Sequence, residues 1–216
     1  MAHLIPDKEL AKVPLRDNGE KMVSVKDACP KIAIRLGHYI RKEGRKFCED
    51  ACLVRESVAE KLNLAQSLLP NGHRLLLRCG YRPLSIQIKR YNWMENKLKK
   101  KHPDWSKEKL KVETGKCVAP LDIVPPHSTG GAVDVSIIGP DGRRLDMGSQ
   151  LGRFTEKTYT CSKKISTEGI KNRKILIRVM KKAGFVNYPT EYWHWSYGDQ
   201  YWAAILKKKH SIYKGL

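Results

Sequence analysis

Four segments of the chain repeat apolar side chains every three or four residues: 53–69, 84–101, 106–112 and 169–183. This spacing buries one face of a helix, so the pattern predicts a helix in each segment. Gly184 follows the last of them, where a glycine commonly ends a helix.

Strand patterns lie between these helices. The apolar run of 73–79 predicts a buried strand that carries Gly80-Tyr81-Arg82-Pro83 at its end. Apolar residues alternate with small or polar ones in 132–138, the period of a half-buried strand. Two further strands are expected over 185–188 and 192–197. In the first fifty residues, prolines and an Asn-Gly pair separate short apolar runs, which indicates strands and turns.

Length and composition favour one domain of the α+β class. With 216 residues the chain fits a single domain, and it can bury about 70% of its unfolded surface without disulfides. We expect one domain over 1–216, in which a small antiparallel sheet carries helices packed on one face.

No signal peptide or membrane span is predicted. The N-terminus has no apolar run after a basic start, and no stretch approaches the roughly 20 apolar residues that cross a bilayer. We therefore expect a cytoplasmic protein without membrane contact, whose six cysteines are reduced. Cys48 and Cys52 are four residues apart, but without a second cysteine pair structural thiols are favoured over a metal site.

The formal charge is +20, from 42 lysines and arginines against 22 acidic residues. The densest basic run covers 89–116. Basic stripes can bind nucleic acid, but no finger-type cysteine pairs and no aromatic RNA-binding signature accompany this one. A solvated helix face, or attraction for anionic cell-wall fragments, explains the charge as well. We expect no nucleic-acid partner, and the oligomeric state is not predicted.

Two short stretches carry the side chains that can bind a metal. His127 and Asp134 stand seven residues apart in His-Ser-Thr-Gly-Gly-Ala-Val-Asp, and Glu191 and His194 stand three apart in Glu-Tyr-Trp-His. An odd spacing points side chains to opposite faces of a regular strand. Gly130-Gly131 allows a sharp turn between the first pair. We place His127 in a loop, Asp134 on a strand, and Glu191 just before the last strand.

Two imidazoles and a carboxylate suit catalytic zinc, which takes three protein ligands and keeps one position for water. We expect His127, Asp134 and His194 to bind one Zn²⁺ per chain, and Glu191 to take a proton from the water. Structural interpretations stay open: His194, between two tryptophans, would also suit a core position, and Glu191 would suit a solvated surface.

These stretches resemble the zinc D-alanyl-D-alanine peptidases, and in particular the D-Ala-D-Ala dipeptidases of the vancomycin-resistance type. The family pattern is S-x-H-x-x-G-x-A-x-D followed by E-x-x-H near the C-terminus. Gly80-Tyr81-Arg82-Pro83 is similar to the dipeptidase segment G-Y-R-P, and 145–149 is similar to the segment that follows the metal strand. The resemblance runs over about 53–202.

By this resemblance, His127, Asp134 and His194 are the zinc ligands, Glu191 is the general base and acid, and Arg82 stabilises the oxyanion. The implied fold is shared with the hedgehog signalling domain. A donor aimed at developing negative charge often lowers a barrier by about 3–4 kcal/mol. A structural arginine bonded to carbonyl groups would explain Arg82 equally well.

Two positions depart from the family pattern. Pro125 replaces a serine, and Gly152 replaces an aspartate that helps to hold the amino group of the substrate. Asp146 or Glu156 would have to supply the missing carboxylate. We expect the substrate to contact Tyr81, Asp146 and Trp193.

The expected reaction is zinc-dependent hydrolysis of D-alanyl-D-alanine, or of a related dipeptide that contains D-amino acids. Without a carboxylate at Gly152, a carboxypeptidase or endopeptidase acting on longer peptidoglycan peptides is the enzymatic alternative. A zinc-stabilised binding module without catalytic activity is the alternative of another class.

Overall fold

A five-stranded sheet forms the centre of the computed structural model, which describes residues 4–120, 123–153 and 155–216. The strand order is β2-β4-β5-β7-β6. Strand β2 runs parallel to β4, and the other neighbouring pairs are antiparallel. The strands are β2 (Ala33–Ile34), β4 (Arg74–Cys79), β5 (Ala132–Ile138), β6 (Val186–Asn187) and β7 (His194–Ser196).

The predicted α+β class is confirmed, although the sheet is mixed because of the β2–β4 pair. A separate two-stranded sheet pairs β1 (Met22–Ser24) with β3 (Leu53–Arg55). This pairing removes three residues from the helix predicted over 53–69, and the helix α5 therefore spans Glu56–Ser67.

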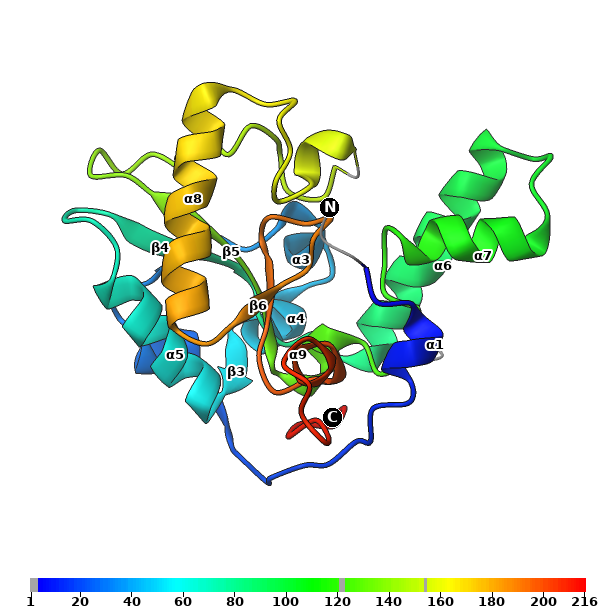
Figure 1. Cartoon of the computed structure of the whole chain (residues 1–216), viewed down its shortest axis with the longest axis horizontal. Coiled ribbons are helices and arrows are strands. Elements are labelled where there is room, and N and C mark those ends of the chain that lie inside the picture. Colours follow the sequence, from blue (N-terminus) through cyan, green and yellow to red (C-terminus); the bar gives the residue numbers. More distant parts are fainter. Residues whose placement is uncertain (1–3, 121–122, 154) are drawn as a thin grey trace.

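Strand β5 lies between β4 and β7, and all seven of its residues are buried. Val133, Val135 and Ile137 face a core that also contains residues of α5 and of α8 (Thr167–Lys182). Both helices lie on one side of the sheet (Figure 1). The prediction of a half-buried strand is wrong for β5, because the opposite face, with Asp134, is covered as well.

Helices α6 (Leu84–Lys101) and α7 (Lys107–Gly115) form a hairpin that projects from the sheet (Figure 1). The bounds predicted for α6 are confirmed, and α7 continues three residues past its predicted end. A small cluster that includes Tyr91, Met94 and Val118 packs within this hairpin. The hairpin therefore stands as a separate wall beside the sheet (Figure 1).

The first fifty residues contain more helix than predicted. The two short strands β1 and β2 are present, but four short helices accompany them: α1 (Asp7–Leu10), α2 (Val25–Ala28), α3 (His38–Lys42) and α4 (Arg45–Asp50). Tertiary contacts hold these helices, because Ile40 of α3 and Phe47 of α4 pack against Cys79 at the end of β4. At the other end of the chain, Trp202 of α9 (Gln200–Ile205) packs with Leu10 of α1.

The loop predicted to lie over the pocket contains a short 3₁₀ turn, η2 (Glu156–Thr158). Phe154 in this loop, and residues 121–122 in the segment that leads to His127, lie outside the described residues. None of the helices in the described ranges is both long and apolar enough to cross a membrane.

Candidate active site

His127 lies on a tight turn between the two prolines that precede it and the glycines that follow it. The turn is a 3₁₀ helix, η1 (Pro126–Thr129), where an irregular loop was expected, and Gly130 ends it with a φ of +73°. The Nδ1 atom of His127 lies 2.8 Å from the Gly80 carbonyl oxygen. A carbonyl only accepts, so Nδ1 donates its proton. The second nitrogen, Nε2, is therefore the one that faces Asp134.

Asp134 and His194 are directly paired across β5 and β7. The Nδ1 atom of His194 lies 3.3 Å from Oδ1 of Asp134, and Nε2 of His127 lies 3.3 Å from the same oxygen. All three side chains are buried. Two imidazole nitrogens thus approach one carboxylate oxygen, and their binding of a shared metal stays a prediction.

Each histidine separately has the spacing to Asp134 that two donors on one zinc ion have, although the groups of donor atoms within 4.8 Å of one another place His127 with Cys79 and Asp134, and His194 with Glu191 and Asp134. Donors about 2.05 Å from a tetrahedral ion lie about 3.3 Å from each other, and both nitrogen–oxygen distances here have that value. With Nδ1 donating to Gly80, the Nε2 atom that faces the carboxylate can share a cation with it, either a proton or a metal ion. A carbonyl bond at the other ring nitrogen is also the usual support of a metal-binding histidine.

The charged groups in the site also favour a cation between Asp134 and the two histidines. Burial alone would lower the pKa of His127, but the Asp134 carboxylate outweighs it and raises the pKa to about 9. Burial alone would raise the pKa of Asp134, but His127 and His194 hold it well below its usual range. Asp134 is therefore an anion that attracts positive charge to the point where the two imidazoles meet.

Glu191 stands in the turn that precedes β7, as predicted. Donor atoms of Glu191, Asp134 and His194 all lie within 4.8 Å of one another. Burial raises the pKa of Glu191, the direction of change that suits a general base that later acts as an acid. Its backbone is fixed, because its carbonyl accepts hydrogen bonds from Asn187 and from the His194 amide.

Arg82 reaches the same centre from the segment after β4. One terminal nitrogen lies 3.9 Å from Oδ2 of Asp134 and donates to the Tyr39 hydroxyl at 3.0 Å; the other donates to Gln87 at 2.8 Å. The guanidinium is therefore held by two side chains that carry no motif in the sequence. Neither Tyr39 nor Gln87 was predicted as part of the site.

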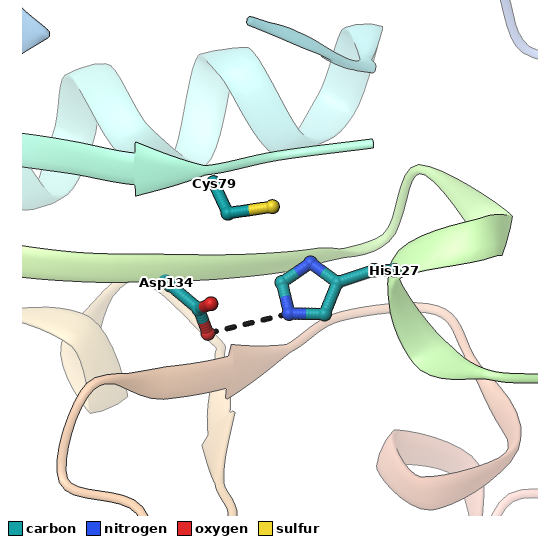
Figure 2. Close-up of side chains that lie close together, drawn as sticks. All are labelled: Cys79, His127 and Asp134. Atoms are coloured by element: carbon teal, nitrogen blue, oxygen red, sulfur yellow. Dashed lines mark ion pairs between the residues drawn. The ribbon is translucent and has the colours of Figure 1, made fainter. Parts of the chain in front are cut away.

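Cys79 is a further member that the sequence did not indicate. Donor atoms of Cys79, His127 and Asp134 lie within 4.8 Å of one another, and the three side chains face each other (Figure 2). Burial raises the pKa of the thiol, but the nearby charge of Arg82 outweighs it and lowers the pKa to about 7. The thiol therefore contributes partial negative charge beside His127 and Asp134.

The site opens into a cleft of about 1110 Å³. Trp193 lines it, as expected, together with Glu191, His194 and Arg82. Tyr81 and Asp146 do not line it. The Tyr81 hydroxyl donates to the Leu216 carbonyl, and Asp146 accepts hydrogen bonds from Ser166 and from the Gly148 amide.

Of the other positions considered in the sequence, two line the cleft and one does not. Pro125 and Gly152 line the cleft. Glu156 is exposed and forms an ion pair with Lys164, so it does not supply a carboxylate to the site.

Comparisons with known proteins point in one direction. A family model, Peptidase M15, described as D-ala-D-ala dipeptidase, matches residues 20–214. The chain is 32% identical over 97 residues to the D-alanyl-D-alanine dipeptidase of Synechocystis sp., covering 40% of this chain and 39% of that protein. It is 30% identical over 133 residues to the enzyme of the same name from Enterococcus faecalis, covering 60% and 64%. The matched segments thus span less than two thirds of either relative.

Two solved structures are also similar at low identity. The LdcB LD-carboxypeptidase has a TM-score of 0.47 and 18% identity, covering 90% of this chain and 77% of that one. The vancomycin resistance D,D-pentapeptidase VanY, in complex with Zn(II), has a TM-score of 0.45 and 15% identity, covering 94% and 97%.

Proposed function

Because the chain belongs to the M15 peptidases of the D-Ala-D-Ala dipeptidase family, we propose that it hydrolyses D-alanyl-D-alanine or a related D-amino-acid dipeptide with one zinc ion per chain. The observation that carries this proposal is the approach of His127 and His194 to one oxygen of Asp134, at 3.3 Å each. Three protein donors leave a coordination position for water, as catalytic zinc requires.

The roles of the residues follow from their positions. His127, Asp134 and His194 would hold the ion, which when bound supplies Lewis acidity at the scissile carbonyl and activates water. Glu191 takes the proton of the attacking water and returns it to the leaving amine. Arg82, fixed by Tyr39 and Gln87, donates to the oxygen on which negative charge develops. Trp193 forms part of the wall against which the substrate lies.

The size of the cleft supports one alternative substrate, a peptide longer than a dipeptide. Ligand pockets commonly measure about 300–1,000 Å³ for drug-sized molecules, and a dipeptide is smaller than most of these. A cleft of about 1110 Å³ leaves most of its length free beside a dipeptide. This observation supports a longer peptide as an additional substrate.

The test of the proposed function is the variant Glu191→Gln. We expect this variant to bind one zinc ion per chain, like the wild type, because Glu191 is not one of the three proposed ligands. Its kcat for D-Ala-D-Ala should fall at least about 100-fold, the usual contribution of a general base. Metal analysis and a dipeptide hydrolysis assay measure the two quantities.

Two results would contradict the proposal. Unchanged turnover in the Glu191→Gln variant would remove Glu191 from the mechanism. A zinc-loaded wild type that hydrolyses neither a dipeptide nor a longer peptide would favour the zinc-stabilised binding module.

A cytoplasmic location stays a prediction of the sequence. The six cysteines are free thiols in the structure, which supports a reducing compartment.

A further inference from the structure

We propose that the face of α6 that lines the cleft binds the acidic part of a longer peptide, whose C-terminal D-amino-acid dipeptide lies at the catalytic centre. This inference rests on the proposed function and extends its substrate class. It also assigns a role to part of the excess positive charge of the chain.

The cleft follows α6 outward from the catalytic centre. Gln87, which holds Arg82 at 2.8 Å, lines its inner end, and Lys101 lines its outer end. Fourteen residues of helix separate the two, a length of about 21 Å at 1.5 Å per residue. An extended peptide advances about 3.3 Å per residue, so about six residues fit along this wall. A dipeptide would occupy only the inner part.

The wall presents a regular stripe of side chains. Lys89, Trp93, Lys97 and Lys101 all line the cleft, and their spacing of four residues places them on one face of α6. Trp93 is 60% exposed, and the Lys97 ammonium lies 5.1 Å from the centre of its ring. An exposed indole beside the ammonium groups of Lys97 and Lys101 offers both a flat apolar surface and positive charge to a ligand.

The charge of the cleft selects an anionic ligand. Nine lysine and arginine side chains line it against four carboxylates, from Asp7, Glu43, Asp134 and Glu191. Glu43 is already paired with Lys89 at 3.3 Å, and Asp134 and Glu191 belong to the catalytic centre. Within the described ranges, no carboxylate forms an ion pair with Lys97 or Lys101.

A peptide fits this charge better than a free dipeptide does. The ammonium group of a free dipeptide would face the excess of positive charge, whereas a peptide bond at the same place carries none. Carboxylates further along the peptide would then reach the ammonium groups of Lys97 and Lys101. The cleft leads directly to the peptidase centre, which favours a peptide over a nucleic acid as its occupant.

The experiment compares three substrates. They are free D-Ala-D-Ala and two N-acetylated hexapeptides that end in D-Ala-D-Ala and carry two glutamates or two glutamines in their outer half. We expect the acidic hexapeptide to have a kcat/KM about three- to tenfold above that of the neutral one, the size that two exposed ion pairs can give. The ratio should fall toward one in high salt, because mobile ions screen exposed charges.

The variant Lys97→Gln with Lys101→Gln should abolish this preference. A matched control is Lys99→Gln with Lys100→Gln, which removes the same charge from the same helix at exposed positions outside the cleft. The control should retain the ratio of the wild type. Titration of the acidic hexapeptide into the Glu191→Gln variant measures binding apart from turnover.

The outcomes separate the two proposals. Hydrolysis of the dipeptide alone, or of both hexapeptides at equal rates, would contradict peptide binding by the face of α6. The proposed function would remain supported. If no substrate is hydrolysed, the proposed function fails. The titration then tests separately whether the face of α6 binds the acidic hexapeptide. Equal binding of the acidic peptide by both double variants would contradict the proposed role of the α6 face. Displacement of the bound peptide by an oligonucleotide alone would also contradict it.

Discussion

Gly131 determines how closely the turn that carries His127 can approach the sheet. A Cβ atom added to it would lie 2.3 Å from the Tyr197 carbonyl oxygen and 2.9 Å from the Tyr213 ring. The neighbouring Gly130 is required for another reason, its left-handed φ of +73°. The sequence predicted the turn from this glycine pair, but the close packing behind Gly131 depends on Tyr197 and Tyr213, which lie far away in the chain.

We predict that Gly131→Ala lowers the free energy of unfolding by about 1–3 kcal/mol, the usual cost of overpacking a filled core. Zinc affinity should fall as well, because the added atom displaces the turn that joins His127 to Asp134. Gly115→Ala is the control: it adds the same atom to the end of α7, where nothing lies within 4 Å. Urea denaturation should find the control as stable as the wild type or slightly more so. Equal losses in both variants would contradict the steric argument.

At the scale of elements, the loop that leaves β5 is held to the start of α8 by Asp146. Its carboxylate accepts from the Ser166 hydroxyl at 2.6 Å and from the Gly148 amide at 2.7 Å. Ser166 is also the residue that caps α8, accepting from the Gly169 amide. The sequence suggested contact with substrate for Asp146, but these bonds support a structural role.

Asp146→Asn separates these two roles. We expect a loss of about 1 kcal/mol in the free energy of unfolding, which is modest because the side chain is exposed and its hydrogen bonds compete with water. The kcat/KM for D-Ala-D-Ala should stay at the wild-type value, since Asp146 does not line the cleft. A tenfold fall in kcat/KM in a variant that is still folded would return Asp146 to the substrate.

The elements that could be predicted are those whose pattern is complete within one segment. Helix α6 has its apolar stripe and its bounds within 84–101. The short strands β1 and β2 and the helices around them span five residues or fewer in most cases, and they depend on partners that the local pattern does not name. Sequence reasoning therefore described the second half of the chain better than the first fifty residues.

The site divides in the same way. Its proposed ligands and base could be found because each carries a motif, whereas Cys79 could not. Leu75 and Leu77 face the main core, and regular alternation would point Cys79 there too. An irregularity between Leu77 and Cys79 instead sets Cys79 opposite Asp134. A β-bulge re-aims a side chain in this manner, and no residue in the run marks its position.

On the scale of the whole molecule, the two ends of the chain are joined behind the turn that carries His127. The Asn18 amide donates to the Ile212 carbonyl, and the Leu216 amide donates to the carbonyl of Ser128, next to His127. Glu20 accepts from the Tyr213 hydroxyl at 2.7 Å and from the Ser57 amide and hydroxyl at 2.9 and 2.8 Å. One carboxylate thus ties the N-terminal segment to α5 and to the C-terminus.

This carboxylate makes the stability depend on pH. Burial alone would raise the pKa of Glu20, but the hydrogen bonds from Tyr213 and Ser57 outweigh it and lower the pKa below its ordinary value of 4.5. A carboxyl group whose pKa is lowered by folding stabilises the protein above its unfolded pKa. That contribution disappears as the pH falls through the folded value.

We predict that Glu20→Gln costs about 1 kcal/mol of unfolding free energy at neutral pH, less than a fully buried charged hydrogen bond because the side chain is partly exposed. Urea denaturation at a series of pH values should find a constant difference from the wild type above pH 4.5, which shrinks below it. Glu9→Gln is the control, because it removes one charge from an exposed pair with Lys12 and should change stability less. If the difference in unfolding free energy between the wild type and Glu20→Gln stays the same well below pH 4.5, the Glu20 charge is not its cause. The difference would then come from the altered hydrogen-bond geometry of the glutamine side chain.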